Sequence, residues 1–369
     1  ALASGDDLVD VGLMAGVPED RVGRRVEHPV QRKGELDGAQ VRAEVSTGVR
    51  HRRDDEVADL TGEIVQFLVR EVPQVGGLAD SLQIHAALTL SPLLPQRVTG
   101  PTVVLMSIPD GSPFDLTGHV ALVTGGNGGI GLGMADALAA HGADVAIWGT
   151  NPDKNDSAIE QLGRHDVELL SIVCDVGDEA AVEQAMADTI GELGRIDSCF
   201  VNAGVGGQAP SFVGMTSDEW RRVMRINLDG AFFTAREAAR HMVARHDDGD
   251  EAGGSIVFTT SGSAFFGQQS GQHYGASKAG VNSMMKAIAV QHARHGIRCN
   301  SVLPGWIETE MTAGAFGWDK FVANVLPRVP MRRWGTADDF GGLAVYLASR
   351  ASSYHTGDVI TIDGGYHSF

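Results

Sequence analysis

The stretch that decides the fold is HVALVTGGNGGIGLGMADALAAHGA, residues 119–143. It begins as a short β-rich run, passes through a turn dense in glycine, and continues as a helix with apolar residues at helical spacing. Gly125, Gly129 and Gly131 fall where the strand passes into the helix. Glycine permits a tight turn and close approach to a ligand, while free N–H groups and the helix dipole favour a pyrophosphate. The chain has 48 glycines, so the position between strand and helix carries this prediction, and the cluster alone does not.

The rest of the chain alternates strand-like runs with amphipathic stretches. Such alternation implies right-handed βαβ units, so we expect an α/β fold, Rossmann-like and doubly wound, with a mostly parallel seven-stranded sheet and helices on both faces. Ligands bind such sheets beyond the carboxyl ends of the strands. Asp178 and Thr336 fit helix starts, and Asp339 completes a capping box with Thr336. The predicted strands span about 119–124, 144–149, 168–174, 196–201, 255–261, 297–303 and 358–362.

A proton-transfer site is outlined by Tyr274, Lys278 and Ser261. The tyrosine and lysine lie four residues apart, so a helix places them on one face, and Ser261 ends the apolar run SIVFTTS thirteen residues before the tyrosine. A neighbouring ammonium favours the phenolate, so we expect Lys278 to lower the pKa of Tyr274 and make it a usable general acid/base. Alone, a Tyr and a Lys at this spacing are more often an ordinary surface pair.

From about Phe114 to Phe369 the chain resembles the classical short-chain dehydrogenase/reductase family. The resemblance implies an NAD(P)-dependent enzyme that acts on CH–OH groups, similar to gluconate and other sugar-acid dehydrogenases and to 3-oxoacyl carrier-protein reductases. The matching motifs are TGxxxGxG at Thr124, Gly125, Gly129 and Gly131, NAG at Asn202, Ala203 and Gly204, the helix asparagine Asn227, the serine Ser261, YxxxK at Tyr274 and Lys278, PG at Pro304 and Gly305 with Thr309, and DGG at Asp363, Gly364 and Gly365.

The resemblance gives each catalytic residue a role. Tyr274 would pass a proton to or from the substrate oxygen while hydride moves, and Ser261 would donate a hydrogen bond to that oxygen. Lys278 would hold the nicotinamide ribose hydroxyls, and Asn227 would position a water that links Lys278 to solvent. Taken in isolation, Ser261 could cap a strand end and Asn227 could satisfy backbone groups inside a helix.

The family's cofactor contacts carry over to a larger set of positions. Thr309 would contact the nicotinamide amide, although it could also cap a helix, and Asp175 would contact adenine with the backbone of Val176, although it could be a simple turn residue. The cofactor-binding residues expected on this basis are Gly125, Asn127, Gly129, Ile130, Gly131, Thr150, Asn151, Asp175, Val176, Asn202, Ala203, Gly204, Tyr274, Lys278, Pro304, Gly305, Ile307 and Thr309.

The choice between NAD and NADP depends on the end of the second strand. A carboxylate there receives the adenosine ribose of NAD, and a basic residue accommodates the 2′-phosphate of NADP. Neither marker is present, because residues 149–151 are Gly, Thr and Asn, and Gly128 stands where many NADP-dependent relatives carry Arg or Lys. Lys154 is the only nearby cation, so we expect NAD over NADP.

The substrate is a small molecule whose identity the sequence leaves open. A moderately polar secondary alcohol or ketone, such as a sugar acid or polyol, suits the lining segments; the alternatives are a 3-oxoacyl thioester reductase and, in another class, a redox-inactive nucleotide-binding sensor or scaffold. An intact Ser, Tyr, Lys and Asn set argues against the scaffold. The lining residues expected are Gln208, Phe265, Phe266, Gln268, Gln272, His273, Phe316 and Trp318.

The domain organisation is uneven. We expect residues 106–369 to form the catalytic domain and residues 1–105 to be an N-terminal extension, because 21 of 22 aromatic residues lie after residue 105. Three interpretations of the extension stay open: a disordered or weakly helical segment, a small docking element, or upstream sequence foreign to the natural protein, with Met106 as a plausible native start.

Composition limits the partners and the location. The formal net charge of −18 argues against binding nucleic acid. The absence of a long apolar run or a signal peptide predicts a cytoplasmic protein off the membrane. The three cysteines predict buried thiols, and we expect no metal site. The family resemblance implies a homotetramer or homodimer formed through the helices near 217–245 and 271–295.

Overall fold

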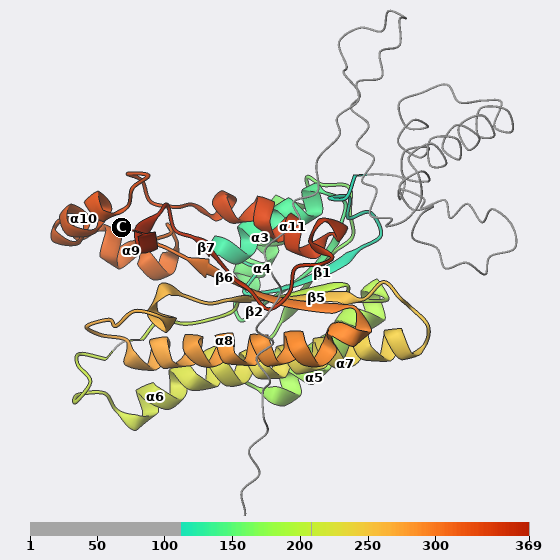
Figure 1. The fold of residues 1–369 in the computed structure, drawn as a ribbon, viewed down its shortest axis with the longest axis horizontal. Coiled ribbons are helices and arrows are strands. Elements are labelled where there is room, and N and C mark those ends of the chain that lie inside the picture. Colours follow the sequence, from blue (N-terminus) through green and yellow to red (C-terminus); the bar gives the residue numbers. More distant parts are fainter. Residues whose placement is uncertain (1–111, 208, 369) are drawn as a thin grey trace, which may run out of the picture. The chain divides into compact units, whose positions relative to one another are not determined.

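The fold is built on one parallel sheet. The computed structural model describes residues 112–207 and 209–368, and within them seven strands lie in the order β3-β2-β1-β4-β5-β6-β7 (Figure 1). The expectation of a Rossmann-like, doubly wound sheet is confirmed, while the predicted extension, residues 1–105, lies outside the described residues. The strands are β1 (Val120–Thr124), β2 (Asp144–Gly149), β3 (Leu169–Val173), β4 (Ser198–Val201), β5 (Gly254–Thr259), β6 (Ile297–Pro304) and β7 (Val359–Ile362).

Helices cover both faces of the sheet. In Figure 1, α3, α4 and α11 lie on one side of the strands and α5, α7 and α8 on the other. The helices are α3 (Gly129–Ala140), α4 (Pro152–Leu162), α5 (Glu179–Leu193), α6 (Ser217–Met224), α7 (Gly230–Asp247), α8 (Gln272–His292), α9 (Glu310–Phe316), α10 (Asp319–Val325) and α11 (Gly341–Ala348).

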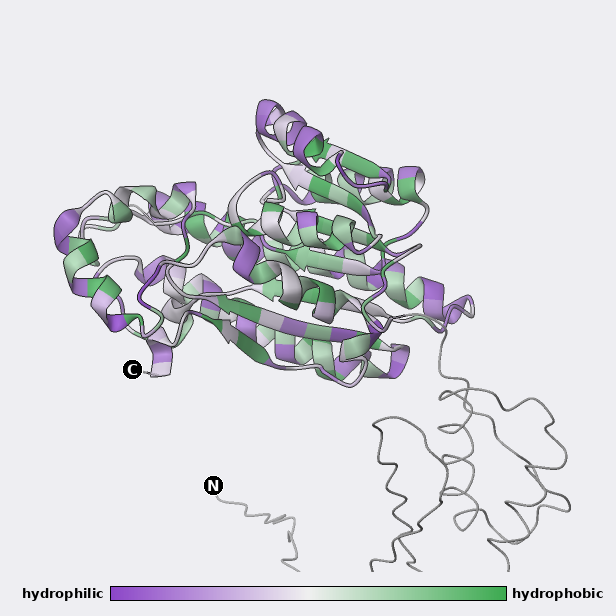
Figure 2. Cartoon of the chain, turned by 90° about the horizontal axis from the view of Figure 1, so that it is seen from above, coloured by the Kyte–Doolittle hydropathy of each residue, from purple (hydrophilic) through white to green (hydrophobic). Residues whose placement is uncertain are grey.

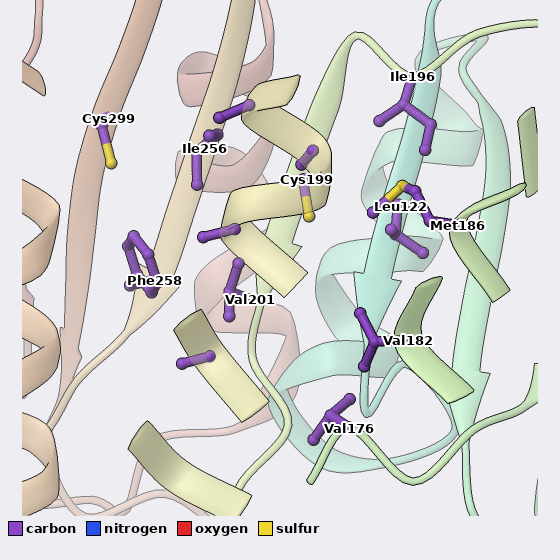
Figure 3. Close-up of a cluster of buried hydrophobic side chains, with 14 of the residues drawn as sticks. Leu122, Val176, Val182, Met186, Ile196, Cys199, Val201, Ile256, Phe258 and Cys299 are labelled. Carbon is purple, nitrogen blue, oxygen red and sulfur yellow. The ribbon is translucent and has the colours of Figure 1, made fainter. Parts of the chain in front are cut away.

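The central strands are buried on both faces, as parallel strands between two helix layers must be. All five residues of β1 and all four of β4 are buried. Their side chains feed two separate cores, one beneath each helix layer. Figure 3 shows the core under α5, α7 and α8, where Phe258, Val201 and Leu122 pack with the thiols of Cys199 and Cys299. In Figure 2, which colours each residue by hydropathy, the strands inside the fold are mainly hydrophobic and the hydrophilic residues lie on the outer helices.

Local signals explain the ends of the helices. The Asp178 carboxylate accepts the N–H groups of Ala180 and Ala181 at 3.0 and 3.3 Å and so caps α5 at its first turn. Gly194 ends this helix with φ of +81°, a conformation that favours glycine. Thr336 begins the short 3₁₀ turn Ala337–Phe340 with the predicted capping box. All three cysteines are buried and unpaired, as predicted.

The amphipathic segment 217–245 is not one regular helix. A π-helical turn, Arg225–Asp229, separates α6 from α7 and widens the backbone around Asn227. Such π turns inside helices are frequent at functional sites.

The carboxyl ends of the strands meet at one edge of the sheet. The strand order reverses between β3-β2-β1 and β4-β5-β6, which makes the gap beyond β1 and β4 the switch point where ligands bind in such folds. The described part of the chain contains no helix that is both long enough and apolar enough to cross a bilayer.

Candidate active site

Tyr274 and Lys278 lie one turn apart on α8, as their spacing predicts. The Lys278 Nζ atom is 5.8 Å from the centroid of the Tyr274 ring. Lys278 is only 4% exposed, and its ammonium donates a hydrogen bond of 2.8 Å to the backbone carbonyl of Thr259 at the end of β5. Burial disfavours the charged form, and it lowers the pKa of Lys278 to about 8.

Ser261 follows β5 and hydrogen-bonds with Tyr274. Its hydroxyl also accepts the N–H of Ser263 at 3.3 Å, so it caps the 3₁₀ turn Gly262–Ala264 as well. Burial raises the pKa of Tyr274, and the hydrogen bond with Ser261 offsets only part of that rise. The expectation of a lowered Tyr274 pKa is wrong, because burial is the largest influence on this pKa and raises it. Tyr274 is therefore protonated at neutral pH and can donate its proton.

Asn227 joins the π turn to the loop after β4. Its side-chain amide donates to the Val205 carbonyl at 3.0 Å and accepts the Val205 N–H at 2.8 Å. A Cβ built on Gly204 would lie 3.3 Å from the Asn227 Oδ1 atom and 3.4 Å from the Lys278 Nζ atom. The asparagine and the lysine thus converge on the same backbone segment, where a side chain at position 204 would be tightly packed.

The glycine turn between β1 and α3 has the shape of an anion cradle. Gly125 and Gly129 adopt φ of +64° and +51°, in the left-handed region that favours glycine. A Cβ on Gly131 would lie 2.3 Å from the Gly125 carbonyl oxygen, so the third glycine is required by close packing. No side chain caps α3, and its first turn carries no acidic residue. The turn fits the pyrophosphate of a dinucleotide, since the N-terminal N–H groups and the helix dipole attract a phosphate.

Comparison with known proteins agrees with this geometry. A family model described as enoyl-(acyl carrier protein) reductase matches residues 125–367. The chain is also similar to gluconate 5-dehydrogenase of Gluconobacter oxydans, with 35% identity over 260 residues that cover 70% of this chain and 98% of that protein. The chain belongs to the short-chain dehydrogenase/reductase family. It is therefore an NAD(P)-dependent oxidoreductase that acts on CH–OH groups.

Solved structures of other short-chain dehydrogenases/reductases share the fold. A member from Mycobacterium marinum has 39% identity and a TM-score of 0.64, and the match covers 69% of this chain and 97% of that one. A gluconate 5-dehydrogenase from Burkholderia cenocepacia J2315, in complex with NADP and tartrate, has 33% identity and a TM-score of 0.65 over 70% of this chain and 98% of that one.

Three of the residues predicted to bind the cofactor, Asn202, Ala203 and Thr309, lie against the glycine turn of this short-chain dehydrogenase/reductase. A Cβ on Gly129 would lie 3.1 Å from the Thr309 Cγ2 atom, so the start of α9 faces the turn across the site. Thr309 is also the N-cap of α9, so its capping of this helix and its position facing the glycine turn are compatible. Gly305 donates its N–H to the Ile362 carbonyl at 2.8 Å, which ties the PG segment to β7.

Several predicted cofactor residues use their side chains inside the protein. Asn202 donates to the Thr124 carbonyl at 3.0 Å and accepts the Thr259 hydroxyl at 3.0 Å, so it connects β1, β4 and β5. Ile307 is 4% exposed and belongs to the core under α3 and α11, and its carbonyl accepts the Thr312 hydroxyl at 2.5 Å. The Asp175 carboxylate is 3.0 Å from the Arg225 guanidinium.

Two further predicted residues organise the end of β2. Asn127 donates a hydrogen bond of 2.7 Å to Asn155, whose amide in turn donates to the Gly149 carbonyl at 3.2 Å. Asn151 caps α4 by accepting the Lys154 N–H at 3.1 Å. Thr150 is exposed beside them. The asparagine side chains therefore fix the backbone at the end of β2, where the nucleotide is expected to bind.

Sequence reasoning missed the partners of His273. This residue is fully buried directly before Tyr274, and its Nε2 atom lies 3.1 Å from the Glu219 carboxylate on α6. Glu219 also pairs with Arg222, which donates to the Gly206 carbonyl at 2.8 Å. The network fixes the loop after β4 against the start of α8. His273 and Glu219 are 54 residues apart in the chain, so no local pattern reveals their contact.

Proposed function

We propose that this enzyme moves a hydride between a nicotinamide cofactor and a secondary alcohol or ketone of a sugar acid or polyol. The observation that supports it most directly is the convergence of Ser261, Tyr274 and Lys278 at the carboxyl end of β5. Similarity to gluconate 5-dehydrogenases supports the substrate class.

The proton moves at the Tyr274 hydroxyl. When bound, the nicotinamide supplies the hydride chemistry, and the protein supplies geometry and electrostatics. Tyr274 donates its proton to a carbonyl oxygen during reduction, and its raised pKa means that the hydroxyl carries this proton at neutral pH. Ser261 donates a hydrogen bond to the same oxygen and stabilises the charge that develops there.

Lys278 and Asn227 support that transfer. Lys278 lies beside the Tyr274 ring, where its ammonium would hold the nicotinamide ribose hydroxyls. Asn227 fixes the Val205 backbone next to the lysine and positions a water that links Lys278 to solvent. The residues around the glycine turn bind the rest of the cofactor.

NAD is the proposed cofactor in preference to NADP. The Lys154 ammonium on α4 lies 2.7 Å from the Glu310 Oε1 atom on α9. A 2′-phosphate at the end of β2 would meet a cation that is already neutralised and a carboxylate that repels it. The test is to compare kcat/KM for NADH and NADPH with the same substrate. A larger value for NADPH contradicts the proposed preference for NAD.

The residues expected to line the substrate region support a substrate that is only partly apolar. Phe265, Phe266 and Trp318 are 57%, 55% and 58% exposed, while Phe316 stacks on Trp334 at 4.4 Å between ring centroids. A 3-oxoacyl thioester reductase is the second candidate, because the chain is 34% identical over 250 residues to a 3-oxoacyl-[acyl-carrier-protein] reductase of Chlamydia pneumoniae.

Assembly and location complete the proposal. We retain a homotetramer or homodimer through α7 and α8, supported by the exposed side chains of Phe232 on α7 and Val290 on α8, which are 44% and 83% exposed. The cytoplasmic location stays a prediction from the sequence. Light scattering of the purified protein measures the assembly, and a monomer at working concentration contradicts it.

A substrate panel tests the proposed activity. Sugar acids, polyols and 3-oxoacyl thioesters are incubated with each nicotinamide cofactor, and the absorbance of the reduced nicotinamide is followed. We expect turnover of at least one sugar acid or polyol. Turnover confined to 3-oxoacyl thioesters favours the second candidate, and no turnover of any member contradicts the proposal.

A further inference from the structure

A histidine–aspartate pair lies in the C-terminal segment that follows β7. The Asp363 carboxylate accepts the ring Nδ1–H of His367 and also the backbone N–H groups of His367 and Gly365, at 2.7 and 2.8 Å. Desolvation acts to raise the pKa of Asp363, but these hydrogen bonds hold it below its usual value, so the carboxylate stays charged. The imidazole is thereby fixed in one orientation, with its Nδ1 atom committed to Asp363.

The opposite edge of the ring faces the segment that carries Ser261. A Cβ built on Gly262 would lie 2.6 Å from the His367 Nε2 atom, so the imidazole rests against the residue that follows the serine. The Phe266 ring lies 4.7 Å from the His367 ring between centroids and covers its side. Within residues 112–207 and 209–368, the Nε2 atom has no hydrogen-bond partner. In Figure 1 the C-terminal end lies beside α9.

Asp363 is closely packed against the segment that follows β6. A Cβ on Gly305 would lie 2.6 Å from the Asp363 Cα atom, so the PG segment after β6 packs directly on the aspartate. His367 therefore stands between the segment expected to hold the nicotinamide and the segment of the reactive serine. The mechanism proposed above gives His367 no role.

We propose that His367 recognises an oxygen atom of a polyhydroxylated substrate through its Nε2 atom, with Asp363 as the positioning residue. The inference rests on the proposed function and deepens it. A neutral imidazole held by Asp363 accepts a hydroxyl proton at Nε2, and a charged imidazole donates to a hydroxyl or carboxylate oxygen. Sugars and sugar acids offer such an oxygen next to the reacting carbon, whereas a simple alcohol has none.

Two substitutions separate recognition from packing. His367→Phe keeps a planar ring against Phe266 and removes the Nε2 atom, while His367→Gln keeps a hydrogen-bonding group at about the same reach. The matched control is His355→Phe. His355 also pairs with an aspartate, Asp358, at 3.1 Å, but at the other end of β7. D-gluconate, D-sorbitol and cyclohexanol are the probes, with kcat and KM measured separately for the full-length chain.

The expected result is selective. His367→Phe lowers kcat/KM for D-gluconate or D-sorbitol about 10- to 100-fold, as loss of a hydrogen bond to a charged or strongly polar group does, mainly through KM. His367→Gln retains most of the activity, and cyclohexanol turnover changes less than about twofold. Loss on D-gluconate alone identifies a carboxylate oxygen, and loss on both probes identifies a hydroxyl.

Other results overturn the inference. Unchanged kinetics of His367→Phe on D-gluconate and D-sorbitol exclude recognition, and an equal loss on cyclohexanol or in His355→Phe shows a structural effect. Wild-type turnover of cyclohexanol without either polyhydroxylated probe also contradicts it. Failure of the proposed function looks different, because the wild type would then turn over no substrate of the panel.

Discussion

Replacing Lys278 with methionine is expected to stabilise the fold against unfolding at neutral pH while abolishing activity. Lys278 is buried, and burial lowers its pKa from 10.5 in the unfolded chain to about 8. At 1.36 kcal/mol for each pKa unit, keeping this group charged costs about 3 kcal/mol at pH 7. The lost hydrogen bond to the Thr259 carbonyl works in the opposite direction by about 1–3 kcal/mol. The net expectation is a gain of about 1 kcal/mol.

The pH dependence of the free energy of unfolding gives the sharper test, because the hydrogen bond to Thr259 contributes the same amount at each pH and cancels from the difference. Between pH 8 and 10.5 the unfolded chain holds the Lys278 proton and the folded protein does not, so the free energy of unfolding rises with pH. For the wild type this contribution grows by about 1.3 kcal/mol from pH 7 to pH 9. Lys278→Met lacks it, so the stability advantage of the variant shrinks by that amount.

Urea unfolding at pH 7, 8 and 9 and at one protein concentration measures both quantities. Lys286→Met is the control, because Lys286 is exposed on the same helix and should follow the wild type. An identical pH slope in the wild type and Lys278→Met would refute the reasoning, since it would mean that Lys278 keeps its ordinary pKa in the folded protein.

Three further predictions concern the cofactor site and the core. Glu310→Gln frees Lys154 and should raise kcat/KM for NADPH relative to NADH severalfold; an unchanged ratio contradicts the account of the ion pair. Gly131→Ala should weaken nucleotide binding, measured by calorimetry, more than about tenfold, because the added Cβ has no room. In contrast, Gly191→Ala places its Cβ in open space on α5 and should raise the free energy of unfolding by about 0.5–1 kcal/mol. Phe258→Ala should lower the free energy of unfolding by about 3–5 kcal/mol in urea; a loss below 1 kcal/mol would show that the core closes around the gap.

The sequence predicted the sheet well because its strands are buried runs with sharp ends. All seven strands lie within two residues of the expected positions, since each apolar run is bounded by glycine, a charge or a helix cap. The segment 217–245 was harder. Its hydrophobic periodicity indicates a helix but does not show the π turn at Arg225–Asp229, which depends on contacts with the loop after β4.

The placement of Tyr274 and Lys278 on one face of a helix was predicted correctly, but the direction of the Tyr274 pKa shift was not. The spacing of Tyr274 and Lys278 indicates that they share a face, yet it says nothing about how much water reaches them, and burial determines the direction of both pKa shifts. The pairing of Asp363 with His367 was visible in principle, because the two lie four residues apart. The partner of His273 was not, because tertiary packing alone brings Glu219 to it.

Turnover and nucleotide binding of Tyr274→Phe, measured side by side, test the central claim that Tyr274 transfers the proton. The substitution removes one oxygen atom and leaves the ring beside Lys278. We predict that the dissociation constant for the nucleotide changes less than about threefold while kcat falls by about 100- to 10,000-fold. Turnover that stays within a few-fold of the wild type would contradict the assignment.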